Sequence, residues 1–136
     1  MTHFILKKSN IHGVGIFADR DFKRGDLVIK WSAPLLLTME ALEILPEKEK
    51  HNVSYINGEF MLVPPESRVN HSCNPNVTLR NFCYFAKRKI KKGEEITADY
   101  REESWPGFNM KCTCGSKKCE GLVKIAGKAP KGMTFS

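Results

Sequence analysis

Three cysteines lie close together near the end of the chain, in the segment KCTCGSKKC. Cys112, Cys114 and Cys119 have the spacings C-x-C and C-x4-C. Thiolates so close in sequence, with a glycine that permits a tight turn, can surround one soft cation, and zinc takes four ligands in a tetrahedron. Unpaired thiols without a metal are the alternative, although closely spaced thiolates repel one another and oxidise. The tail therefore predicts three ligands of a zinc site.

A fourth ligand must come from elsewhere in the chain, and two further cysteines are available. Cys83 lies in the apolar run NFCYFA, where a single cysteine is typical of a small core residue. Cys73 lies in VNHSCNPN, residues 69–76, which is too polar for a core strand and contains the turn-forming pair Asn-Pro. We therefore predict that Cys73 completes the zinc site and that the tail covers the segment around it.

The segments between these motifs predict a mainly β domain of small sheets with short helices. Strands are expected at 4–8, 27–31, 60–63, 77–80, 81–90 and 96–100. A helix is expected over 38–50, with Thr38 as its N-cap and a break or restart at Pro46. Residues 101–111 are expected to form a linker. The stretches IFADRDFKRGDLV and YFAKRKIKKGEEI resemble each other, which suggests a repeated strand-turn-strand shape.

Length and composition set the limits of the interpretation. A chain of 136 residues fits one domain with a real core, and 41% apolar and 27% charged residues are an ordinary globular balance. The longest apolar run, 33–37, is interrupted by Pro34, so no membrane partner is expected. The N-terminal lysines follow a very short apolar patch, unlike a secretory signal. We expect a reducing intracellular location, where clustered cysteines indicate a metal rather than disulfides.

Four segments in this order, HGVGIFA, VNHSCNPN, KKGEEITADY and CTCGSKKCEG, resemble a SET domain followed by its cysteine-bearing post-SET tail. The resemblance covers about residues 3–122. It implies a SET-domain β-clip fold, with small curved sheets around a C-terminal pseudoknot, and a protein lysine methyltransferase that uses S-adenosylmethionine. We expect a SET domain over 1–108 with a short insert at about 38–67, a zinc-bound tail over 109–125 and a flexible end over 126–136.

The resemblance also implies roles for individual residues. Asn70 and His71 would hold the amino-acid and adenine parts of the cofactor, while Leu122 would pack on the adenine. Tyr100 would face the reacting nitrogen as the catalytic residue and would also contact the cofactor. Without the motif, Tyr100 is typical of a core tyrosine at a strand end, and His71 of a structural hydrogen-bonding residue. The stretch whose backbone would meet the cofactor comprises His12, Gly13, Val14 and Gly15.

The sequence departs from the family pattern in the predicted substrate channel. The family often has Phe or Tyr two residues before the catalytic tyrosine, where it limits the number of methyl groups. Here Ala98 leaves space for di- or trimethylation, unless Tyr55, Phe82 or Tyr84 fills the gap. We assign Tyr55, Tyr84 and Ala98 to the channel. The short insert leaves the peptide contacts undefined.

The distribution of charge bears on the partner. The net charge is +7, yet residues 40–66 and residues 94–103 each sum to −4. An acidic surface around the site of an otherwise basic protein would suit a protein substrate with a target lysine, such as a histone tail. The alternative is that these acids belong to a solvated helix face and a solvated turn. Residues 87–92, KRKIKK, fit a localisation signal or nucleic-acid patch, but solvated turn lysines are the favoured interpretation.

These observations predict a zinc-containing protein lysine methyltransferase in the cytoplasm or at chromatin in the nucleus. The alternative is a catalytically inactive, zinc-stabilised SET-like module that binds basic peptides or nucleic acid. The cofactors expected for the enzyme are S-adenosylmethionine and zinc.

Overall fold

The computed structural model describes residues 4–32, 34–50, 52–63 and 68–129. Residues 64–67 of the expected insert and the part of the expected flexible end beyond residue 129 lie outside these residues. The strands are β1 (Phe4–Lys8), β2 (Val14–Ala18), β3 (Leu27–Lys30), β4 (Leu35–Leu36), β5 (Ser54–Ile56), β6 (Glu59–Leu62), β7 (Asn70–His71), β8 (Val77–Arg80), β9 (Cys83–Ala86), β10 (Glu95–Ala98), β11 (Asn109–Lys111) and β12 (Leu122–Lys124). The helices are α1 (Met39–Ile44), α2 (Glu47–Lys50) and the 3-10 helix η2 (Tyr100–Glu102).

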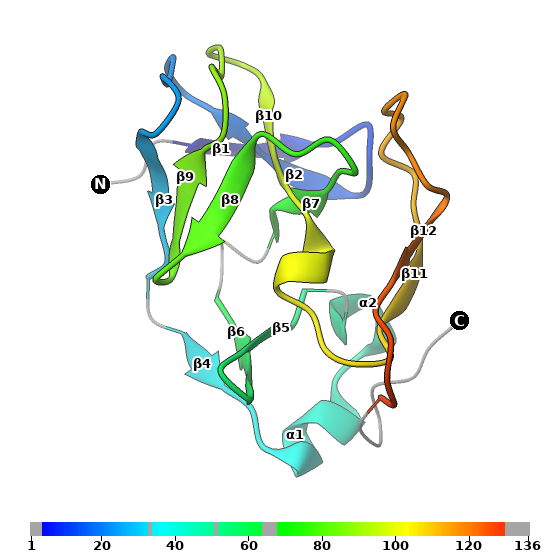
Figure 1. Cartoon of the computed structure of the whole chain (residues 1–136). Helices are drawn as coiled ribbons and strands as arrows, with labels where there is room; N and C mark the ends of the chain where they lie inside the picture. Colours follow the sequence, from blue (N-terminus) through cyan, green and yellow to red (C-terminus); the bar gives the residue numbers. More distant parts are fainter. Residues whose placement is uncertain (1–3, 33, 51, 64–67, 130–136) are drawn as a thin grey trace.

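The strands form small sheets, and the predicted mainly β fold class is confirmed. In the described chain the sheet orders are β1-β2-β10-β7, β3-β9-β8, β4-β6-β5 and β11-β12. In Figure 1 the first two sheets make up the upper part, β4, β5 and β6 lie below with the helices, and β11 and β12 run along one side. No helix in the described part is long and apolar enough to cross a membrane.

Two loops that belong to the related sequence stretches pair with each other. Residues 19–26 and 87–94, which we call the paired loops, meet where Phe22 and Ile90 exchange backbone hydrogen bonds of 2.8 and 3.0 Å. Ala18, just before the loop 19–26, exchanges backbone hydrogen bonds with Gly93 and Glu94 at the end of the other loop. Ala86, just before the loop 87–94, exchanges backbone hydrogen bonds with Gly25 and Asp26. The sequence similarity therefore corresponds to two similar turns that face each other.

The apolar residues of the central strands gather in two clusters. One lies between the upper sheets around Ile16, Tyr84 and Ile96, and the other lies beneath the tail around Trp105 and Phe108. Trp105 and Phe108 meet edge to face with ring centroids 4.8 Å apart. The second cluster also includes the half-buried cysteines of the tail, so the tail packs on the domain through an apolar surface.

The helix prediction over 38–50 is confirmed in its start and its interruption. The Thr38 hydroxyl accepts a hydrogen bond of 3.1 Å from the backbone N–H of Ala41, and α2 begins directly after Pro46. Three other expectations are wrong. The strand expected at 81–90 is shorter, because β9 ends at Ala86 and the residues that follow form a loop. β10 ends at Ala98, because the Asp99 side chain accepts a hydrogen bond from the backbone N–H of Arg101 and begins a 3-10 turn. The expected linker contains β11, which pairs with β12.

A parallel pairing brings two distant parts of the sequence together. β10 pairs with β7 so that Thr97 lies opposite Asn70 and Ala98 lies opposite His71. The pairing continues past β7, since Ser72 donates a backbone hydrogen bond of 3.0 Å to Ala98. The residue that follows β10 and Asp99 is Tyr100, so this register carries the tyrosine to the NHSC segment, as a pseudoknot requires.

Candidate functional site

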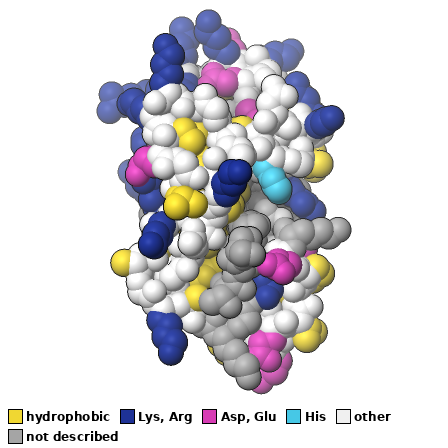
Figure 2. All heavy atoms as spheres, turned by 90° about the vertical axis from the view of Figure 1, so that its right-hand side faces the viewer, with side chains coloured by type: hydrophobic (Ala, Val, Ile, Leu, Met, Phe, Trp, Pro, Cys, Tyr) yellow, Lys and Arg dark blue, Asp and Glu magenta, His cyan; other side chains and the backbone are white. Residues whose placement is uncertain are grey.

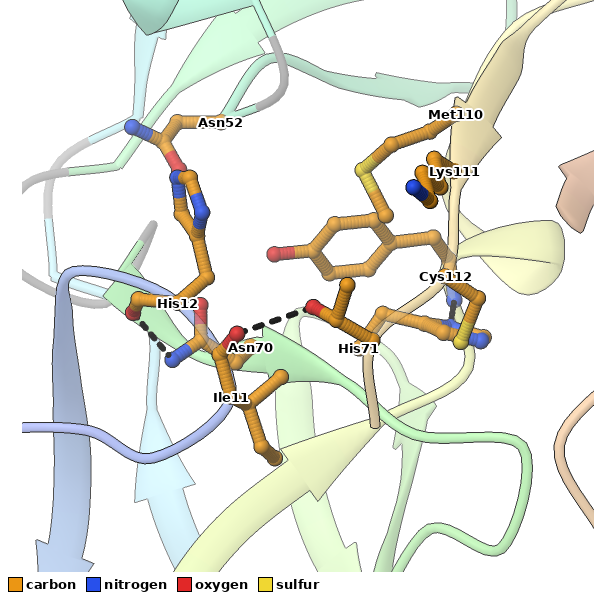
Figure 3. A pocket seen from close by; sticks show the side chains of 10 residues that line it. Ile11, His12, Asn52, Asn70, His71, Met110, Lys111 and Cys112 are labelled. Carbon is orange, nitrogen blue, oxygen red and sulfur yellow. Dashed lines mark hydrogen bonds between the residues drawn. The ribbon is translucent and has the colours of Figure 1, made fainter. Parts of the chain in front are cut away.

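A cavity of about 220 Å³ lies between the loop after β1, the start of β7, η2 and β11. Figure 3 shows the side chains that surround it. The lining residues are Ile11, His12, Asn52, Asn70, His71, Tyr100, Met110, Lys111, Cys112 and Thr113. Four of the residues predicted to bind the cofactor thus meet at one cavity, although they come from three separate parts of the chain.

The glycine loop lies beside this cavity. Gly13 has a φ of +44°, and a Cβ at this position would meet no atom within 4 Å, so its surroundings are open. Gly15 is different, because a Cβ there would collide with the carboxylate of Glu95 and approach the Cβ of Ser9 to 3.0 Å. Val14 is exposed. One glycine therefore permits the turn and the other permits close packing.

Asn70 fixes the glycine loop through its side-chain amide. Its Nδ2 donates to the carbonyl of His12 at 3.0 Å and to the carboxylate of Glu95 at 2.9 Å. Glu95 also accepts hydrogen bonds of 2.8 and 2.9 Å from the hydroxyl of Ser9. Asn70 is 5% exposed, so this network is shielded from water and holds the loop at a defined distance from β7.

The ring of His71 connects Tyr100 to Cys73. The backbone N–H of Tyr100 donates to Nδ1 of His71 at 3.0 Å, so the ring proton belongs on Nε2, which lies 3.5 Å from the sulfur of Cys73. Burial lowers the pKa of His71 and keeps the ring neutral. The carboxylate of Asp99, 3.7 Å from Nδ1, is therefore not an ion-pair partner.

Tyr100 is buried, and its hydroxyl donates to the carbonyl of Val69 at 2.8 Å. Its ring lies 5.4 Å from that of His71 and 6.3 Å, edge to face, from that of Phe108. Burial, together with the nearby carboxylates of Glu103 and Glu95, raises the pKa of Tyr100 well above its usual value. The hydroxyl therefore stays protonated, and the residue can orient a group but is a poor base.

The four predicted metal ligands meet beside the cavity. The sulfurs of Cys73, Cys112, Cys114 and Cys119 all lie within 4.8 Å of one another, and those of Cys73 and Cys112 are 3.7 Å apart. A zinc ion with bonds of about 2.3 Å to four sulfurs in a tetrahedron holds them about 3.8 Å apart. Hence these residues can hold a metal, and the donor set suits zinc. Cys83 lies apart from them on β9.

The thiols of the cluster are in different electrostatic surroundings. Burial raises the pKa of Cys112 above its usual range. Burial alone would also raise the pKa of Cys114. Hydrogen bonds from the backbone at Cys73 and Ser116 outweigh this effect and lower the pKa of Cys114 to about 7. Backbone donors around a thiolate are the outer support that orients metal ligands.

Polar contacts fasten the tail over the cavity. The hydroxyl of Thr113, two residues after β11, donates to the carbonyl of Ile11 at 2.9 Å, which joins the tail to the loop after β1. Arg101 contacts Glu120 at 2.7 Å and forms a forked pair with Asp99 at 2.9 Å. Opposite sides of the tail are thus tied to the loop after β1 and to η2.

The predicted channel residues do not line the described cavity. Tyr84 is buried, and its hydroxyl donates to both carboxylate oxygens of Glu103 at 2.9 Å. Tyr55 lies on β5, where its backbone N–H donates to the carbonyl of Glu103 at 2.7 Å, and its ring centroid is 4.7 Å from that of Phe60. Ala98 is buried in β10 beside His71. Their role in a channel stays a prediction, as does that of the exposed Leu122 on β12.

Sequence reasoning missed the side chains that support the site. Glu95 follows a lysine-rich turn and resembles a solvated acid, and only the pairing of β10 with β2 turns it towards Ser9 and Asn70. Glu103 is 7% exposed, and burial raises its pKa to about 8. Neither position has a distinctive sequence signal. Thr113, by contrast, lies inside the CTC motif that identified the tail.

Comparison with known proteins identifies the family of the chain. The family model described as "SET domain" matches residues 13–101. The chain is 33% identical over 137 residues to Histone-lysine N-methyltransferase TRX1 of Oryza sativa subsp. japonica. It is 34% identical over 139 residues to Histone H3-lysine(4) N-trimethyltransferase ATX1 of Arabidopsis thaliana. Each alignment covers 85% of this chain but 13% of the relative.

A solved structure gives independent support for the fold. The methyltransferase domain of human Histone-lysine N-methyltransferase SETMAR matches with a TM-score of 0.72 at 17% identity, over 93% of this chain and 59% of that one. The two plant relatives are much longer proteins, and this chain spans 13% of each. Since the family model matches most of the chain and the fold agrees, the chain belongs to the SET-domain family.

Proposed function

We propose that the chain transfers a methyl group from S-adenosylmethionine to a lysine side chain of a histone or another basic protein. The observation that carries the proposal is the pairing of β7 with β10, which brings Asn70, His71 and Tyr100 to one cavity beside the four cysteines. The relatives named above are histone-lysine methyltransferases, which gives the reaction class and favours a nuclear, chromatin-associated location.

The cavity has groups suited to the cofactor. His12, Asn70, His71 and Tyr100 line it, and the open space beside Gly13 lets a ligand approach the backbone. Val14, Gly15 and Leu122 remain proposed contacts at its margin. When bound, S-adenosylmethionine supplies a methyl group already activated by a positively charged sulfur, so alignment matters more than a strong base.

The residues of the chain would therefore act by orientation and by exclusion of water. A free lysine has a pKa of about 10.4, and a dry channel near a positive charge lowers it, which favours loss of the proton before transfer. Tyr100 is well suited to orient the resulting amine, because burial raises its pKa, its proton is held by the Val69 carbonyl, and its oxygen is left to accept a hydrogen bond from the amine N–H. The Val69 carbonyl fixes the direction of that hydroxyl.

Zinc, held by Cys73, Cys112, Cys114 and Cys119, would fix the tail over the cavity. The part of the chain that lines one wall, Met110 to Thr113, lies next to these ligands. Metal binding at such sites supplies much of the local folding energy. We therefore assign zinc a structural role, in which it closes the cofactor site without taking part in the reaction.

The surface supports a basic substrate only on the side of the insert. Most acids within residues 94–103 already form hydrogen bonds inside the protein and are not free to attract a substrate. Glu95 bonds to Asn70, Asp99 to Arg101, and Glu103 to Tyr84. Exposed acids lie instead on the insert, and acidic side chains gather at the lower end of the face in Figure 2. Ala98 has only a methyl group as its side chain and restricts the site little, so we propose that the chain can add more than one methyl group.

The test is label transfer with a matched variant. The chain is incubated with labelled S-adenosylmethionine and core histones, and the experiment is repeated with Tyr100→Phe. Transfer by the native chain, with loss in the variant while calorimetry still detects cofactor binding, supports the proposal. Cofactor binding by neither protein, or binding of histone peptides without transfer, would instead indicate the inactive module.

A further inference from the structure

The paired loops, residues 19–26 and 87–94, concentrate positive charge at one end of the molecule. They hold eight basic and four acidic residues, a net charge of +4 out of the chain's +7. All of the basic side chains are exposed. The basic residues are Arg20, Lys23, Arg24, Lys87, Arg88, Lys89, Lys91 and Lys92.

The fold makes one surface of these two loops. The backbone hydrogen bonds between Phe22 and Ile90 join the loops at their middle, and those from Ala18 and Ala86 join them at their ends. The two turns stand side by side at the top of Figure 1, and dark blue side chains crowd the same end in Figure 2. Charges that are far apart in the sequence therefore lie on a single framework fixed by hydrogen bonds.

Three of the four acids of the loops, Asp21, Asp26 and Glu94, accept hydrogen bonds from backbone N–H groups of the loops, and the lysine ammonium groups are not paired with them. Asp21 accepts a hydrogen bond of 2.7 Å from the N–H of Lys92, and Asp26 accepts one of 2.9 Å from the N–H of Lys23. Glu94 pairs with Arg88 at 2.9 Å, the one ion pair found within these two fully described loops. These three carboxylates thus stabilise the turns, and the lysine ammonium groups are left on the outside.

We infer that the paired loops are a docking surface for duplex DNA, which they contact through the phosphates. Exposed lysines and arginines on a fixed framework suit a regular array of negative charge. Single strands are bound by stacking on exposed aromatic rings, but Phe22, the one aromatic residue of the loops, is 1% exposed. No residue that lines the cavity comes from either loop, so bound DNA would leave the cofactor site open.

The test compares two variants with the same loss of charge. One removes four lysines of the surface (K23Q, K87Q, K89Q and K92Q). The other removes four exposed lysines from elsewhere in the chain (K8Q, K30Q, K124Q and K128Q). Binding to a labelled duplex of about 20 base pairs is measured by fluorescence anisotropy between about 50 and 200 mM salt. No cofactor or histone is present, so the result is independent of the proposed methyl transfer.

The dissociation constant of the loop variant should rise about tenfold or more over that of the native chain. Its dependence on salt should also weaken, by about 0.9 in the logarithmic slope for each phosphate that the variant no longer neutralises. The control variant should remain much closer to the native chain. Equal weakening in both variants would overturn the proposal, because it would show attraction by net charge alone. Tighter binding to single strands or polyglutamate than to the duplex would overturn it as well.

Discussion

Glu103→Gln should stabilise the protein at alkaline pH, although it removes a hydrogen-bonded side chain from the interior. Glu103 is buried directly after η2, where both carboxyl oxygens lie 2.9 Å from the hydroxyl of Tyr84. Burial raises its pKa from an ordinary value near 4.5 to about 8. Glutamine has the same shape and can still accept from Tyr84, but it has no charge to bury.

The sign of the effect follows from where the proton is held. The folded chain keeps the proton on Glu103 up to about pH 8, while the unfolded chain releases it near 4.5. Between these values unfolding releases a proton, so the free energy of unfolding falls as the pH rises. At about 1.4 kcal/mol per pH unit, the native chain should lose about 3 kcal/mol relative to Glu103→Gln between about pH 5.5 and 8.5.

Urea unfolding of the zinc-loaded proteins at several pH values measures this difference. The matched control is Glu102→Gln, which changes the same residue type at the adjacent exposed position. Comparison at each pH cancels the titration of groups that the variants share, the cysteine ligands included. The reasoning would be refuted if the difference in unfolding free energy between the native chain and Glu103→Gln stayed constant with pH. It would also be refuted if the Glu102→Gln control showed the same pH-dependent difference as Glu103→Gln.

Three further predictions concern the cofactor site and the metal. Gly15→Ala should lower the free energy of unfolding by about 1–3 kcal/mol in urea, since its Cβ would collide with the Glu95 carboxylate; an unchanged midpoint would show that the carboxylate moves freely. Asn70→Ala should weaken binding of S-adenosylhomocysteine about tenfold in calorimetry, because the glycine loop loses its hydrogen bond; native affinity would contradict this role. Cys112→Ser should lose zinc in metal analysis while Cys83→Ser keeps one ion per chain; equal zinc in both variants would rule out the proposed ligand set.

The metal ligands were predictable because their chemistry is local. Cys112, Cys114 and Cys119 lie within a short stretch, and Cys73 lies in a polar turn, whereas Cys83 lies in an apolar strand. The fold brings the first four together and leaves the fifth elsewhere. The order of the motifs predicted the family for the same reason, since each motif can be recognised without knowledge of its partners.

The support of the site was not predictable, because it depends on contacts between distant segments. β7 has only two residues and pairs in parallel with β10, and so short a strand has no periodicity to detect. Glu95 and Glu103 look like solvated acids in the sequence, yet one holds Asn70 and the other is buried against Tyr84. The 3-10 turn at Tyr100 is capped by the Asp99 side chain and held by backbone hydrogen bonds from Glu102 to Asp99 and from Glu103 to Tyr100, which prevail over the strand pattern.

The most direct test of the proposed function is calorimetric titration of the zinc-loaded chain with S-adenosylhomocysteine, repeated after removal of the metal. The cofactor is expected between the glycine loop, Asn70, Tyr100 and the tail, and the four cysteines are responsible for the position of the tail. We therefore predict one binding site per loaded chain and about tenfold or greater loss of affinity without zinc. Absence of binding to the loaded chain, or equal affinity with and without the metal, would contradict this prediction.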